Sequence, residues 1–130
     1  MLQTIPKENN MKKKISAEMM AEKFKVTDEK VKEAVQRLIE TYKPLYIYTF
    51  GSYAKGQSDL ESDFDVMVVI DQFDDTPWAV TSRGYLKLGS LLMPVDLLVY
   101  DKTKFEVCKN DKTTFCYKIV KTGRLLYERK

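Results

Sequence analysis

The stretch GSYAKGQSDLESDFD, residues 51–65, follows the apolar run LYIYTF and leads directly into VMVVI. Both flanking runs are rich in aromatic and β-branched residues, so the sequence predicts strands over 45–50 and 64–70, the second one central in its sheet. A glycine and a serine therefore stand at the end of one strand, and two aspartates stand at the start of the next. This stretch therefore connects two predicted strands and contains most of the candidate site residues.

The rest of the chain alternates helical and strand patterns. Residues that favour helix starts precede apolar positions at helical spacing in four segments. These predicted helices start at Ser16, Thr27, Thr76 and Asp111, and further strands are predicted over 94–100 and, as an edge strand, over 124–128. Because strands and helices interleave, we expect an α+β fold with a small mixed central sheet that helices cover mainly on one face.

The chain is predicted to form one domain over residues 15–130, preceded by a mobile basic arm. Residues 1–14, MLQTIPKENNMKKK, are polar and show no periodicity, as in segments that do not bury a core. The longest apolar run, 66–70, is too short to cross a bilayer, and the N-terminus lacks the apolar part of a secretion signal. We therefore expect a cytoplasmic protein without a membrane partner.

Several large apolar side chains are expected to pack into the core. They include Met19, Met20, Trp78 and Phe115, which lie on predicted helices. Asp71, Asp74 and Asp75 follow a predicted strand in a polar segment and are expected to be solvated turn residues.

The chain contains no histidine and two cysteines, Cys108 and Cys116. This composition excludes a zinc site and the serine–histidine and cysteine–histidine pairs of nucleophilic catalysis, and it favours two reduced, packed thiols. Chemistry must come from carboxylates, lysines, tyrosines or a metal. The net charge of +3 and a pI of about 8.7 are modest for a nucleic-acid-binding domain, so a nucleic-acid substrate is not expected, whereas a phosphate-bearing small ligand is.

The carboxylates have the spacing of metal ligands. Asp63 and Asp65 are two residues apart at a strand start, so both side chains point to one side, about 7 Å apart at the backbone. Two like charges at that distance imply a cation, and oxygen-only ligands suit Mg²⁺ or Mn²⁺. Asp96, in the apolar strand PVDLLVY, is the third candidate because burying it without a partner would cost several kcal/mol. It joins the pair if its strand lies beside 64–70.

Gly51 and Ser52 are the candidate phosphate-binding residues. Glycine lets the backbone approach a ligand closely, and exposed amides at the start of the following helical turn attract anions. Lys55 is the nearest positive charge, and we include it as a nucleotide-binding candidate.

Taken together, Gly51-Ser52, Asp63-Phe64-Asp65 and the later Asp96 resemble the signature of the polymerase-β-type nucleotidyltransferase superfamily. The order of elements over about residues 27–128 is similar to its minimal nucleotidyltransferases. The resemblance implies a nucleotidyltransferase fold in which three aspartates hold two metal ions and the Gly-Ser pair contacts phosphate. Many relatives have arginine where this chain has Tyr53, which puts one phosphate contact in doubt.

The resemblance also implies a function. Minimal nucleotidyltransferases are often paired with a HEPN-type helical toxin, and as antitoxins they transfer AMP from ATP to a tyrosine of that partner. A second copy of the chain is the other candidate for holding the acceptor. The main alternative is a non-catalytic antitoxin that neutralises its partner by binding. Modification of an antibiotic or sugar is a weaker alternative, because it usually involves an additional helical domain.

Overall fold

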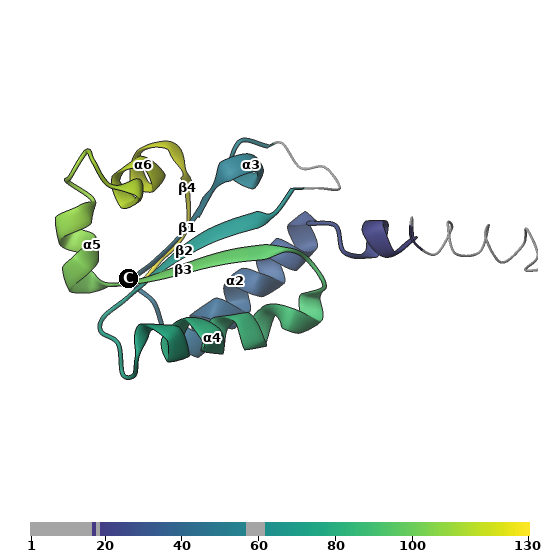
Figure 1. The fold of residues 1–130 in the computed structure, drawn as a ribbon, viewed down its shortest axis with the longest axis horizontal. Helices are drawn as coiled ribbons and strands as arrows, with labels where there is room; N and C mark the ends of the chain where they lie inside the picture. Colours follow the sequence, from purple (N-terminus) through teal and green to yellow (C-terminus); the bar gives the residue numbers. More distant parts are fainter. Residues whose placement is uncertain (1–16, 18, 57–61) are drawn as a thin grey trace, which may run out of the picture.

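The computed structural model describes residues 17, 19–56 and 62–130, and these form a four-stranded sheet with helices around it (Figure 1). The strand order is β3-β2-β1-β4. β1 pairs antiparallel with β2 and with β4, whereas β2 and β3 are parallel, so the predicted mixed sheet is confirmed. The strands are β1 (Tyr46–Phe50), β2 (Phe64–Ile70), β3 (Val95–Asp101) and β4 (Arg124–Glu128).

Helices connect the strands largely where their start signals predict them. The labelled helices are α2 (Asp28–Tyr42), α3 (Gly51–Ala54), α4 (Pro77–Leu88), η1 (Gly89–Leu91), α5 (Lys102–Cys108) and α6 (Phe115–Thr122). A further short helical segment covers 19–23. The predicted mobile arm over 1–14 and the cap at Ser16 lie outside the described residues.

Two details of the C-terminal helices differ from the prediction. α5 was not expected, and the N-cap of α6 is Thr114, whose hydroxyl accepts a hydrogen bond from the Tyr117 amide at 3.1 Å. The predicted cap, Asp111, instead accepts hydrogen bonds from the amide of Thr113 at 2.9 Å and from its hydroxyl at 2.6 Å, within the turn before the helix. Aspartate forms such local turns as readily as it caps helices.

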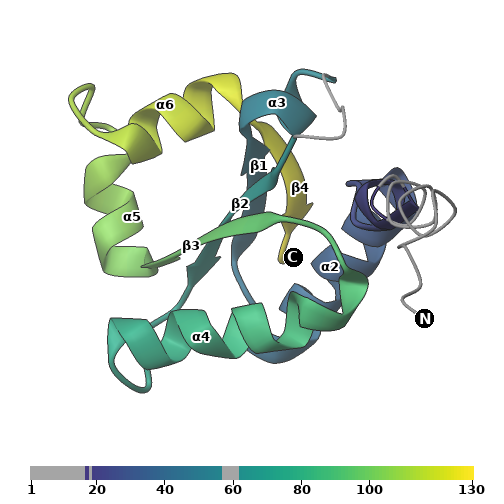
Figure 2. The same cartoon turned by 45° about the vertical axis from the view of Figure 1, so that its right-hand side comes forward.

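Helices cover both faces of the sheet, as the two views of the ribbon show (Figures 1 and 2). The larger core lies under α2 and α4 and includes Val66 and Val68 of β2. α5 and α6 add a smaller core on the opposite face, to which Met67 and Val69 contribute. Alternate residues of β2 thus enter different cores, which explains its continuous apolar sequence.

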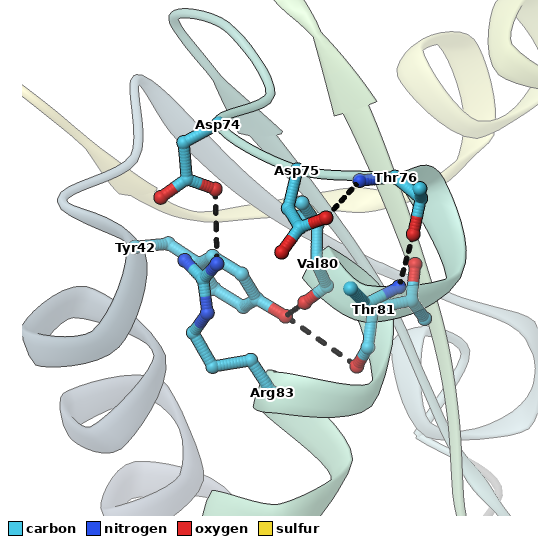
Figure 3. A network of polar contacts seen from close by, with 8 residues as sticks. Tyr42, Asp74, Asp75, Thr76, Val80, Thr81 and Arg83 are labelled. Atoms are coloured by element: carbon cyan, nitrogen blue, oxygen red, sulfur yellow. Dashed lines mark hydrogen bonds and ion pairs between the residues drawn. The ribbon is translucent and has the colours of Figure 1, made fainter.

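The start of α4 is held by a polar network, which Figure 3 shows. The side chain of Thr76 accepts a hydrogen bond from the Ala79 amide at 3.2 Å, which confirms the predicted cap. The hydroxyl of Tyr42 on α2 donates to the Val80 carbonyl at 2.5 Å. Exposed Asp74 accepts from Arg83 at 2.9 Å, and this hydrogen bond lowers the pKa of the Asp74 carboxyl.

Four of the predicted core side chains are exposed. Met19, Met20, Trp78 and Phe115 have exposed fractions of 66%, 53%, 80% and 52%, so the prediction that they fill the core is wrong. The segment with the two methionines precedes α2 and lies beyond its N-terminal end, away from the sheet (Figure 1). α4 buries Val80 instead of Trp78, because only one side of the helix meets the sheet.

The two cysteines are free thiols, as predicted: Cys116 is buried and Cys108 half-buried. Burial, followed by the nearby Cys108, raises the pKa of Cys116 to about 11, so it stays protonated at neutral pH. In the described part of the chain, no helix is long and apolar enough to cross a membrane.

Candidate functional site

Strand pairing brings together residues that are far apart in the sequence. Asp65 of β2 lies beside Asp96 of β3 in the parallel register. On its other side, Asp65 lies beside Phe50, the last residue of β1. The prediction that the strand with Asp96 pairs with the strand that begins at Phe64 is therefore confirmed.

The alternation of side chains shows which face these carboxylates occupy. Phe50 and Met67 belong to the core under α5 and α6, and Leu98 packs against that core. Asp65 is two residues from Met67, and Asp96 is two residues from Leu98, so both carboxylates project toward the same face. The site therefore lies on the side of the sheet that α5 and α6 cover.

The electrostatics of Asp65 show an excess of negative charge. Burial is the largest cause that raises its pKa to about 6, and the charges of Asp96 and Asp63 raise it further. Asp63, one residue before β2, is exposed. None of the ion pairs within the described residues involves these three aspartates. A bound cation would stabilise the charged form of Asp65 and offset the repulsion among the three carboxylates.

Asp96 differs from the prediction in its burial. The sequence suggested a buried carboxylate that needs a partner, whereas the side chain is exposed on β3, an edge strand of the sheet. Solvent therefore offsets the cost that the argument from burial assumed. Asp96 remains available to a ligand.

The candidate ligands suit a hard cation by the type of their ligand atoms but not by their positions. Three carboxylates and no histidine match the ligand preference of Mg²⁺ or Mn²⁺. Among residues 17, 19–56 and 62–130, however, no group of three or more acidic, histidine or cysteine side chains is close enough to hold a metal ion. The ligands therefore share a neighbourhood without forming a complete site.

Gly51 is required by its contact with Asp65. It has a φ of 71° and opens α3 directly after β1. A methyl group at this position would overlap the Asp65 carboxylate oxygen. Glycine therefore allows the turn after β1 to lie against the carboxylate of β2, a close approach that any other side chain would block.

A cleft of about 320 Å³ opens over the carboxylates. Gly51, Lys55, Asp65 and Asp96 line it, so the structure brings these four candidates together. Ser52 is half-buried on α3, and neither it nor Asp63 is among the described lining residues. The other side of the cleft is formed mainly by α6, with Phe115, Lys118, Ile119 and Thr122.

Sequence reasoning missed the contribution of α6. Its apolar residues were assigned to the core, which is correct for Cys116 and Ile119. Phe115, Lys118 and Thr122 follow one another at intervals of three and four residues, which places them on one side of a helix. That spacing could have revealed a second helical face, although only the fold shows that it meets the carboxylates.

Tyr53, where the resemblance implies an arginine in many relatives, contacts residues outside the cleft. Its hydroxyl donates to Asp28 at 2.7 Å, and its ring packs edge-on against Phe64 at 5.7 Å. The Arg124 guanidinium lies 5.5 Å from the ring centre. Tyr53 thus connects α3 to the start of α2 and makes no contribution to the lining of the cleft.

Comparison with known proteins identifies similar sequences and folds. The family model described as "Polymerase beta, Nucleotidyltransferase" matches residues 29–130. No curated protein matches the sequence.

Three solved structures share the fold. A toxin-antitoxin crystal structure with AMP-PNP is 23% identical, covers 81% of this chain and 76% of its own, and has a TM-score of 0.54. A candidate nucleotidyltransferase from Sulfolobus solfataricus is 19% identical, with coverages of 87% and 86% and a TM-score of 0.50. A mutant of the toxin-antitoxin MntA-HpeT is 20% identical, with coverages of 76% and 73% and a TM-score of 0.51.

Proposed function

The chain belongs to the polymerase beta nucleotidyltransferase family, and on this premise we propose that it transfers a nucleoside monophosphate from a triphosphate, ATP, to a hydroxyl group. The observation that carries the proposal is the adjacent pair Asp65 and Asp96, which lines one cleft with Gly51 and Lys55. Acidic and basic side chains in one cleft match a triphosphate that arrives with divalent cations.

Asp63, Asp65 and Asp96 would hold Mg²⁺ or Mn²⁺ only together with oxygens of the bound triphosphate, because the described side chains alone do not form a complete metal site. When bound, the metal would neutralise charge on the triphosphate. The acceptor oxygen attacks the α-phosphorus and forms a new P–O bond, the bond from that phosphorus to the bridging oxygen breaks, and pyrophosphate leaves. The hydroxyl proton passes to a base, for which exposed Asp96 is the candidate. The amides at Gly51 and Ser52 would contact phosphate.

We expect the acceptor to be a tyrosine of a HEPN-type helical toxin, which makes this chain an antitoxin. Two of the structures with the same fold are toxin-antitoxin structures, and one of them contains AMP-PNP, which supports both the partner and the choice of ATP. The cleft is open at the exposed Asp96, so a side chain from a docked protein has access to the carboxylates.

A second candidate is a non-catalytic antitoxin that binds its partner and transfers nothing. One observation favours it: the described residues do not assemble a group of ligands that could hold a metal. Both candidates predict binding to a helical partner, and only the first predicts a covalent product.

The test uses ATP labelled at the α-phosphate, Mg²⁺ and, as the proposed acceptor, the product of the neighbouring gene. Label on a tyrosine of the partner, lost in Asp63→Ala and Asp65→Ala, supports the enzyme. In a parallel reaction with ATP labelled at the γ-phosphate, label on the partner would indicate phosphoryl transfer and contradict the proposal. Glu128→Ala is the control, because Glu128 is an exposed carboxylate on β4, outside the described cleft lining. Partner binding without any label, unchanged in the variants, supports the non-catalytic antitoxin.

A further inference from the structure

Phe115 presents a fixed aromatic surface to the cleft. It is the first residue of α6, and 52% of its surface is exposed although it is a large apolar side chain. Its ring meets that of buried Phe50 edge-on, with ring centres 5.2 Å apart and planes at 88°. Because Phe50 is the last residue of β1, this contact anchors Phe115 to the sheet beside the candidate carboxylates. An exposed ring that is held in this way costs little entropy when a planar ligand stacks on it.

Lys118 adds a positive charge one turn along the same helix. Its side chain is exposed, and it makes no ion pair with the described residues. Lys55, the residue that follows α3, lines the same cleft. Two lysines therefore occupy the helical side of the cleft, and Asp65 and Asp96 occupy the sheet side. This separation of charges matches a ligand with an anionic chain and bound cations.

The cleft thus combines three features that one ligand class would use: carboxylates, lysines and an aromatic ring. We infer that Phe115 stacks on the base of the bound nucleotide and that Lys118 contacts its polyphosphate. This inference rests on the proposed function, since it concerns the donor nucleotide of the same site. Stacking recognises any base through its π-face, so Phe115 supplies affinity for the nucleoside part, whereas Lys118 supplies affinity for the phosphates.

The experiment measures binding of α,β-methylene-ATP and of inorganic tripolyphosphate, each with Mg²⁺, by calorimetry. Phe115→Ala is expected to weaken binding of the nucleotide by about 5- to 100-fold and to leave binding of tripolyphosphate unchanged. Phe115→Trp restores nucleotide binding, because its larger ring still stacks. Lys118→Met is expected to weaken both ligands by about 3- to 30-fold.

Lys121→Met is the matched control. Lys121 lies one turn further along α6, where it contacts the Tyr117 ring and does not line the cleft. The Lys121→Met variant is expected to bind both ligands as tightly as the wild type does. Circular dichroism and thermal melts of each variant show whether α6 remains folded.

The possible failures are distinguishable. If the wild type binds neither ligand, the proposed function fails and this inference fails with it. If the wild type binds the nucleotide but Phe115→Ala or Lys118→Met binds it equally well, the inference is overturned and the proposed function stands. A loss of tripolyphosphate binding in Phe115→Ala equal to its loss of nucleotide binding also overturns the assignment of Phe115 to the base.

Discussion

Replacing Asp65 by asparagine is expected to stabilise the metal-free protein while it removes a proposed ligand. The carboxylate is half-buried beside Asp96, and its pKa is raised from 3.8 to about 6 by burial first and by the neighbouring aspartates second. In its charged form it therefore destabilises the fold. Asparagine has nearly the same shape and removes that charge.

The size of the effect follows from the pKa. A difference between 3.8 and about 6 corresponds to about 3 kcal/mol at neutral pH. Because solvent reaches part of the side chain, we expect about 1–2 kcal/mol. For a domain of 130 residues, this gain in the free energy of unfolding raises Tm by about 4–7 °C.

The sign of the pH dependence makes the prediction specific. Between pH 3.8 and about 6 the folded protein holds a proton on Asp65 that the unfolded chain releases, so the stability of the wild type falls as pH rises through this range. The advantage of Asp65→Asn should therefore be small at pH 4 and largest at pH 7. Thermal and urea unfolding with a chelator, at pH 4, 5, 6 and 7, measure it.

Glu128→Gln is the control for loss of one negative charge, since Glu128 is exposed on β4, and its Tm should stay within about 1 °C of wild type. Added Mg²⁺ should raise the Tm of the wild type and have less effect on Asp65→Asn. An Asp65→Asn variant that is less stable than wild type at pH 7 would refute the reasoning, as would an advantage that does not change with pH.

The remaining predictions concern backbone positions and Tyr53. Gly51→Ala should lower the free energy of unfolding by about 2–3 kcal/mol, measured by urea unfolding, and weaken nucleotide binding. Gly56 also has a positive φ, of 73°, but open space around it. Gly56→Ala should therefore lower the free energy of unfolding by only about 1 kcal/mol. Gly84→Ala should cost about 1–3 kcal/mol, because a methyl group would overlap side chains of α2 and β3, whereas Gly89→Ala meets nothing and should be neutral or stabilising in the same assay. Tyr53→Phe should cost about 0.5–1.5 kcal/mol, through loss of its hydrogen bond to α2, and leave binding of α,β-methylene-ATP unchanged; weaker binding would show that Tyr53 contacts the ligand.

Local sequence determined the elements and most of the candidate residues. The apolar runs at 45–50, 64–70 and 94–100 identified three strands, because a strand buried on both faces has no polar alternation. Cap residues such as Thr27 and Thr76 marked helix starts, because their hydroxyls accept hydrogen bonds from amides that a helix leaves unpaired. These signals depend on neighbours in the chain, so the sequence alone carries them.

The tertiary structure decided which residues meet. The register between β2 and β3 placed Asp96 beside Asp65, and the packing of α6 placed Phe115 at the cleft and left its ring exposed. Trp78 is exposed for a related reason, since only contact with the sheet selects which side of α4 is buried. Burial, charge and ligand access depend on groups that are distant in the sequence, and only the folded chain determines their distances.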